Sequence, residues 1–148
     1  MYSTPAKKIV LCSDGTGNSS AKAEKTNVWR LFQALDLSDP EQVAKYDDGV
    51  GTSNIKALAL LGGVFGFGLK RNAISLYKFV CRNYPSEADA KKAEELRPDI
   101  YGFGFSRGAF TIRLVISLIT HEGLVDYRSE EELDRNAHTV YRHYRAVS

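Results

Sequence analysis

The amino-acid sequence predicts one α/β domain in which a mostly parallel sheet is covered by helices. Short apolar runs alternate with segments of helical periodicity, in the order strand, helix, strand, helix, strand, helix. This alternation is typical of parallel sheets with crossover helices. The length of 148 residues fits a single domain, and the content of 43% apolar and 26% charged residues fits a packed core. We therefore treat residues 1–148 as one unit.

Composition excludes several classes of protein. The net charge is only +2, without a concentrated basic arm, which argues against nucleic acid as a partner. The two cysteines lie in apolar runs and predict no disulfide framework, and no metal site or cofactor is predicted. No secretory signal is visible, and the longest uncharged apolar stretch, residues 57–69, is shorter than the ~20 residues of a membrane-spanning helix. We expect a cytoplasmic protein, or one exported by a route that needs no signal peptide.

The first third of the chain predicts two strands around one helix. Residues 7–13 read as a buried central strand that ends in a cluster of turn formers at residues 14–18. Thr26 is the expected N-cap of a helix that ends before Pro40. Residues 42–46 fit a short strand. The apolar face of the helix has the spacing i, i+3, i+4, i+7 and consists of Val28, Leu31, Phe32 and Leu35.

The middle of the chain predicts one amphipathic helix between two less regular segments. Residues 57–69 are rich in glycine and lack clean periodicity. We expect them to pack inside the protein, and the alternative is a mobile apolar flap near a lipid site. Residues 71–84 have helical periodicity and end at Pro85. Residues 86–97 carry many charges and predict a solvated surface helix or loop.

The last third predicts a strand and two helices. Residues 99–105 read as a second buried strand. The helix that follows is apolar nearly all round, which predicts burial, and it should end at Gly123. A final polar helix, residues 130–145, begins after Ser129.

Residues 104–108 (Gly-Phe-Ser-Arg-Gly) match the Gly-x-Ser-x-Gly nucleophile elbow. In that motif a serine, here Ser106, lies on a sharp turn between a strand and a helix. Gly104 and Gly108 lack side chains because the backbone passes close to its neighbours there. The amide of Arg107 would then be one donor of an oxyanion hole. The alternative is a tight turn with a serine that takes no part in chemistry.

The loop after the first strand, residues 14–18, permits three interpretations. The backbone amide of Gly15 or Thr16 could supply the second oxyanion donor. Alternatively, Thr16-Gly17-Asn18-Ser19 looks like the phosphate loop of a flavodoxin-like, FMN-binding protein. Asp14 argues against that alternative because its carboxylate would repel the flavin phosphate. The third interpretation is a plain turn held by Asp and Asn side chains.

Several segments, in the right order and nearly from end to end, resemble the uncharacterised α/β-hydrolase domain family that includes the type VI secretion phospholipase effectors of the first lipase class. The resemblance implies a three-layer α/β-hydrolase fold and a serine hydrolase acting on carboxylic esters of phospholipids, with Ser106 as the nucleophile. It also implies a lipid substrate, peripheral membrane contact, and partners of the immunity or assembly kind. The matching segments are residues 14–18, 26–28, 46–52, 62–69, 102–113, 123–124 and 141–145, with Asn72 and Tyr77.

The acid and the histidine of the expected triad have no evident candidates in this chain. In the family they are expected beyond residue 148, the histidine in a His-x-Asp-Val-Gly-Gly-type segment. Asp126 or Asp134 followed by His138 has the order of acid and then histidine that the triad requires. However, Asp134, His138 and His143 lie on one predicted polar helix, and no strand carries them to Ser106. His121 reads as a cation at a helix C-terminus. We expect the N-terminal part of a hydrolase domain, with a bare sheet edge and an uncovered apolar face, or a non-catalytic remnant that acts as an interaction module.

Overall fold

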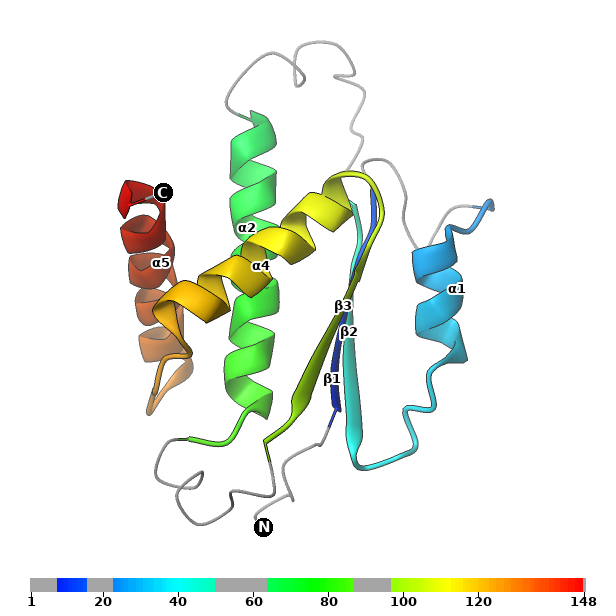
Figure 1. Ribbon diagram of the computed structural model, residues 1–148, viewed down its shortest axis with the longest axis horizontal. Coiled ribbons are helices and arrows are strands. Elements are labelled where there is room, and N and C mark those ends of the chain that lie inside the picture. The colour runs from blue at the N-terminus through cyan, green and yellow to red at the C-terminus, as the bar shows by residue number, and fades with distance from the viewer. Residues whose placement is uncertain (1–7, 16–22, 50–63, 87–96, 148) are drawn as a thin grey trace.

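The structure is a computed structural model and describes residues 8–15, 23–49, 64–86 and 97–147 (Figure 1). In these ranges the chain forms three strands and four helices. The strands pair in the order β2-β1-β3, and both pairs are parallel. The α/β class and the parallel sheet predicted from the sequence are confirmed. The elements are β1 (Lys8–Ser13), α1 (Asn27–Ala34), β2 (Gln42–Asp47), α2 (Val64–Asn83), β3 (Asp99–Gly104), α4 (Arg107–Glu122) and α5 (Glu130–Val147).

The central strand β1 brings the carboxyl ends of all three strands to one level. Its last residue, Ser13, lies opposite Asp47 of β2 and opposite Gly104 of β3. The backbone continues this pairing beyond the strands, since Asp14 N–H donates to the Asp47 carbonyl at 3.0 Å. In parallel sheets, ligands bind at this edge.

Helices cover both faces of the sheet, as Figure 1 shows: α1 lies on one face, and α2 and α4 lie on the other. Helix α5 packs on the outside of α2 and α4. Alternating residues of β1 divide the core, with Val10 and Cys12 packed against Val28 of α1 and with Ile9 and Leu11 turned to the other side. The larger cluster also contains Leu76, Tyr77, Val80, Val115, Leu118 and Leu133, all fully buried.

Three helix ends lie where the sequence predicts them. The Thr26 hydroxyl accepts a hydrogen bond from Trp29 N–H at 3.1 Å and so caps α1. Gly123, at φ 76°, ends α4. The Ser129 hydroxyl accepts from Glu132 N–H at 3.2 Å and caps α5.

The start of α2 differs from the prediction. The helix begins at Val64 rather than at Arg71, so part of the glycine-rich stretch is helical. Glycine lowers helix propensity and weakens the periodic signal, but burial can override propensity, and Leu69 is buried in this turn. The rest of that stretch, residues 57–63, and most of the charged segment, residues 87–96, lie outside the described residues.

The predicted burial of the third strand and its helix is wrong. In the described ranges β3 pairs only with β1 and is an edge strand, and its side chains alternate between exposed and half-buried. Helix α4 buries only one side. No described element covers the outer sides of β3 and α4, so Tyr101, Phe103, Phe105, Phe110 and Ile116 remain 39–55% exposed. None of the described helices is long and apolar enough to cross a membrane.

Candidate active site

Ser106 lies between the end of β3 and the start of α4, directly after Phe105, and has an unusual backbone conformation. Its φ of 54° and ψ of −121° make it the one non-glycine residue with positive φ in the described part of the chain. Such a conformation costs about 1–3 kcal/mol and is retained only where the surrounding structure enforces it. The residue is exposed, and its hydroxyl caps no helix N–H. The turn therefore presents a serine side chain outside the secondary-structure hydrogen bonding.

The two glycines that flank Ser106 explain what enforces this turn. A Cβ on Gly104 would lie 2.5 Å from the Ala109 backbone nitrogen. One on Gly108 would lie 2.0 Å from the Ser13 carbonyl oxygen. Both contacts are with backbone, which cannot yield as a flexible side chain can. Glycine is required at both positions because α4 is pressed directly against the ends of β3 and β1.

The N-terminus of α4 begins directly after Ser106. Arg107 is the first helical residue, and the N–H groups of Ala109 and Phe110 donate to the Ser106 carbonyl at 3.0 and 3.3 Å. The positive end of the helix dipole is therefore directed at the turn and favours negative charge there. Electrostatically, this is a suitable place for an oxyanion next to Ser106.

The loop after β1 lies beside the turn, since Phe105 N–H donates to the Ser13 carbonyl at 3.2 Å. Its carboxylate, Asp14, is 3% exposed and accepts hydrogen bonds from Gly15 N–H at 2.9 Å, Thr26 Oγ1 at 2.5 Å and Tyr46 Oη at 2.7 Å. The Gly15 amide, a predicted oxyanion donor, is thus already bonded to Asp14. Thr16, the other predicted donor, and the proposed FMN loop lie outside the described residues.

Sequence reasoning missed the role of Asp14 as a link between three elements. Its carboxylate joins the end of β1 to the N-cap of α1 and to Tyr46 of β2. Burial and the hydrogen bond to Asp14 raise the pKa of Tyr46, so its hydroxyl remains a donor at neutral pH. An aspartate directly after an apolar strand, with an N-cap threonine downstream, was the available signal. The partner on β2 could not be predicted.

A second carboxylate at the strand ends, Asp47, was also missed. The Ser13 hydroxyl donates to its Oδ2 at 3.2 Å. Burial raises the pKa of Asp47 to about 6, although the bond from Ser13 acts in the opposite direction. Nearby Cys12 has a pKa raised to about 11 by burial and by Asp14, so its thiol stays neutral and is a poor nucleophile.

The structure places the histidines on the surface of α4 and α5 rather than at Ser106. His138 Nε2 lies 3.8 Å from Asp134 Oδ2 on α5, and His143 Nδ1 lies 2.8 Å from Glu122 Oε2. His121 occupies the last turn of α4, as predicted. Within the described ranges, no histidine forms a hydrogen bond with Ser106.

Comparison with known proteins places the chain in a family. Residues 7–148 match the family described as "T6SS, Phospholipase effector Tle1-like, catalytic domain". A curated relative, the uncharacterized protein YEL023C of Saccharomyces cerevisiae, is 30% identical over 154 residues, which cover 95% of this chain and 21% of the relative. The chain thus spans about a fifth of the length of that relative, and no solved structure matches significantly. Because the family match extends over almost the whole chain, the protein belongs to the Tle1-like phospholipase effector catalytic domain family.

Proposed function

We propose that this chain is part of an α/β-hydrolase domain and carries the nucleophile of a serine hydrolase that cleaves carboxylic esters of phospholipids. One observation carries the proposal: in a chain of this family, Ser106 is exposed on a strained turn between a strand and a helix N-terminus. A nucleophile elbow has this conformation because the side chain must project freely toward the substrate.

In the proposed reaction, Ser106 Oγ attacks the ester carbonyl carbon while its proton passes to a general base. The carbonyl oxygen becomes an oxyanion, which accepts hydrogen bonds from the Arg107 amide and from an amide of the loop after β1. Thr16 is the better candidate in that loop, because the Gly15 amide already donates to Asp14. The bond from the carbonyl carbon to the alcohol oxygen then breaks, and the alcohol leaves with the proton. Water hydrolyses the acyl-serine, releases the fatty acid and restores Ser106.

The surroundings of Ser106 support an apolar substrate. Phe105 precedes it and Phe110 lies in the first turn of α4, and these two side chains are 53% and 55% exposed. Exposed aromatic side chains next to a nucleophile provide contact area for an acyl chain or for the surface of a lipid aggregate. The same proposal includes a lipid substrate, contact with the periphery of a membrane, and partners of the immunity or assembly kind.

It also includes the location, which is either the cytoplasm or, after export that needs no signal peptide, the outside of the cell.

The general base and its acid are proposed to come from a segment outside this chain, because the described histidines are bonded or placed elsewhere. The test therefore uses this chain joined to the segment that is proposed to supply the base and the acid. It is incubated with a fluorophosphonate probe, and the adduct is mapped by peptide mass spectrometry. We expect the adduct on Ser106, together with release of fatty acid from phospholipid vesicles.

Two variants separate the nucleophile from unspecific labelling. Ser106→Ala should lose both the adduct and the hydrolysis, whereas Ser38→Ala, an exposed loop serine, should keep both. An adduct on another residue in the wild type, or full hydrolysis by Ser106→Ala, would contradict the proposal.

A second candidate function rests on the uncovered aromatic side chains of β3. Tyr101 and Phe103 are 43% and 39% exposed on an edge strand, as in an interaction module that binds another chain. Hydrolysis that depends on Ser106 would eliminate this candidate as the main function. The family match gives no corresponding support to the flavodoxin-like alternative.

A further inference from the structure

A pocket of about 390 Å³ lies between β2, α2 and α5, and none of its lining residues belongs to the turn around Ser106. Its walls carry far more positive than negative charge. The charged lining residues are Lys45, Lys70, Arg71, Lys78, Arg82 and Asp134. Pockets of this size hold small ligands, and the charge selects for anions.

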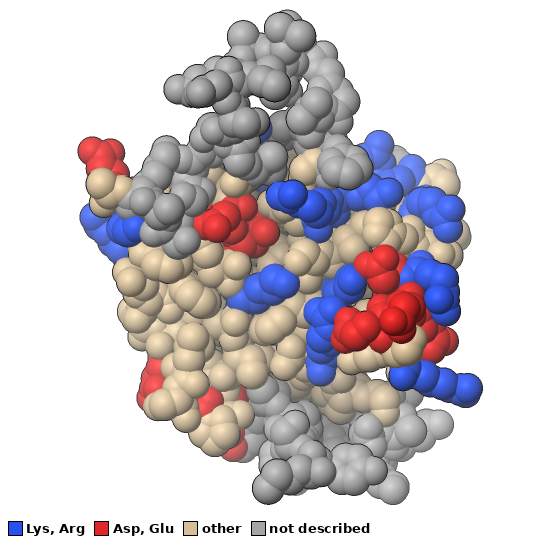
Figure 2. Space-filling model, turned by 180° about the vertical axis from the view of Figure 1, so that it is seen from behind, with Lys and Arg blue, Asp and Glu red and all other residues tan. Residues whose placement is uncertain are grey.

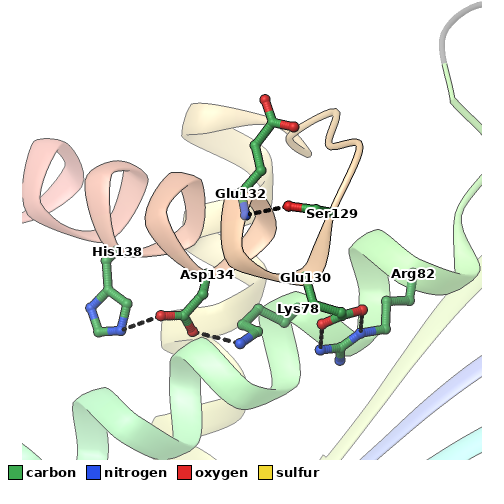
Figure 3. A network of polar contacts seen from close by, with 7 residues as sticks. All are labelled: Lys78, Arg82, Ser129, Glu130, Glu132, Asp134 and His138. Carbon is green, nitrogen blue, oxygen red and sulfur yellow. Dashed lines mark hydrogen bonds and ion pairs between the residues drawn. The ribbon is translucent and has the colours of Figure 1, made fainter.

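Two of the cations that line the pocket are paired with carboxylates of α5. Figure 3 shows Lys78 and Arg82 of α2 directed at Asp134 and Glu130, with Nζ–Oδ1 and Nη2–Oε2 distances of 2.5 and 2.6 Å. These pairs join α2 to α5. Asp134 Oδ2 also lies 3.8 Å from Nε2 of His138, which lines the same pocket.

The other three cations of the lining come from β2 and from the first half of α2. Lys45, Lys70 and Arg71 form no ion pair with any carboxylate in the described part of the chain. Lys45 reaches in from the edge strand β2, with its Nζ 5.8 Å from the centre of the Phe79 ring. Burial and the charges of Arg82 and Lys78 lower the pKa of Lys45, and Asp47 opposes them only in part. An anion placed here would relieve that repulsion.

The positive surface continues beyond the pocket toward the C-terminal end of α5. A neighbouring pocket shares Lys70 and adds Arg142 and Arg145, and its lining contains no carboxylate. Figure 2, seen from the back of Figure 1, shows Lys and Arg side chains gathered on one side of this face around a compact acidic group. The excess of positive charge is therefore local, although the net charge of the chain is only +2.

We propose that the pocket between β2, α2 and α5 binds a phosphate monoester group. The guanidinium of Arg71 suits bidentate contact with phosphate oxygens, while Lys45 and Lys70 add point charges. Ser75 also lines the pocket, and a serine hydroxyl can donate a hydrogen bond to a phosphate oxygen. The group belongs either to a small soluble ester or to a lipid headgroup, which present the same chemistry. This site is independent of Ser106 and of the proposed hydrolysis.

The first experiment titrates the protein with inorganic phosphate by isothermal calorimetry, with sodium chloride at matched ionic strength as the reference. The double variant Lys70→Ala/Arg71→Ala should bind phosphate about tenfold more weakly, because two charge-assisted contacts are lost. Arg113→Ala/Arg135→Ala removes the same charge from exposed positions outside both pockets and should bind as the wild type does. Lys45→Met, which keeps an apolar stem, is the second pocket variant in case the double variant unfolds.

A wild type that binds phosphate no better than chloride would overturn the proposal. So would equal weakening in the pocket and control variants. The second experiment compares glycerol 3-phosphate in solution with phosphatidylcholine vesicles that contain phosphatidic acid. Pocket-dependent binding of the soluble ester supports the site and identifies a small-molecule ligand, whereas pocket-dependent binding of the vesicles alone supports it and identifies a lipid headgroup. Binding of neither overturns it.

Discussion

The turn around Ser106 and the basic pocket beside α2 are built in opposite ways. The turn is made of backbone: a Cβ added to Gly104 or Gly108 would lie only 2.0–2.5 Å from main-chain atoms. All parts of the turn except β1 are contiguous in sequence. The pocket is made of side chains from β2, α2 and α5. In a site formed by close backbone contacts, one added side-chain atom should displace whole elements and destabilise the fold. A side-chain-built site should lose affinity stepwise while the fold stays intact.

The largest expected effect is that of Gly108→Ala. The added Cβ would lie 2.0 Å from the Ser13 carbonyl oxygen, and either β1 or α4 must move. We expect a loss of ~3 kcal/mol or more in the free energy of unfolding, measured by urea denaturation. The matched control is Gly123→Ala, where φ is 76° but nothing lies within 4 Å of the new Cβ, and about 1 kcal/mol should be lost. Equal losses of unfolding free energy for Gly108→Ala and Gly123→Ala would contradict the conclusion that close backbone contacts define the turn.

The next effect concerns Asp47 and depends on pH. Because its pKa in the folded protein is raised from 3.8 to about 6, the folded state holds this proton more tightly than the unfolded state does. The contribution to stability is full below about pH 3.8 and is lost as the pH rises through 6. Asp47→Asn should therefore be more stable than the wild type by about 1–3 kcal/mol at pH 8 and equal to it at pH 3.5. A variant that is less stable at pH 8 would show that the ionised carboxylate stabilises the fold.

A smaller effect is expected at Ser106 itself. Ser106→Gly removes the side-chain clash at φ 54°. Glycine also loses more conformational entropy on folding, which offsets part of this effect, so the free energy of unfolding should rise by about 1 kcal/mol. Ser106→Ala keeps the strain and should leave the melting temperature unchanged. An increase in stability for both variants would attribute the effect to the hydroxyl rather than to the backbone.

The smallest effect on stability is expected at the pocket. Glu130→Gln breaks the exposed pair with Arg82 and should leave the melting temperature unchanged, because exposed ion pairs contribute little. The same variant frees Arg82 and should bind inorganic phosphate about two- to threefold more tightly. A clear loss of stability would mean that this face is held together by its ion pairs and would weaken the contrast with the turn.

Predictions from sequence succeeded where the signal is local. The strand predicted at residues 42–46, the N-cap at Thr26 and the end of α4 at Gly123 depend on neighbours within a few residues. All three are present, with the strand one residue longer than predicted. Burial of β3 and of the whole of α4 was predicted wrongly, because apolar composition reports what a segment can bury and not whether another element covers it.

By itself, the sequence determined the α/β class, the order of elements and the Gly-x-Ser-x-Gly segment. These follow from local periodicity and from a motif whose parts are adjacent. Only the tertiary structure decided that Gly108 abuts Ser13, that Asp14 bonds Tyr46, and that Lys45 faces the cations of α2. Those contacts join residues that are 25 or more positions apart in the sequence. No local pattern encodes them, because strand pairing and helix packing bring these residues together.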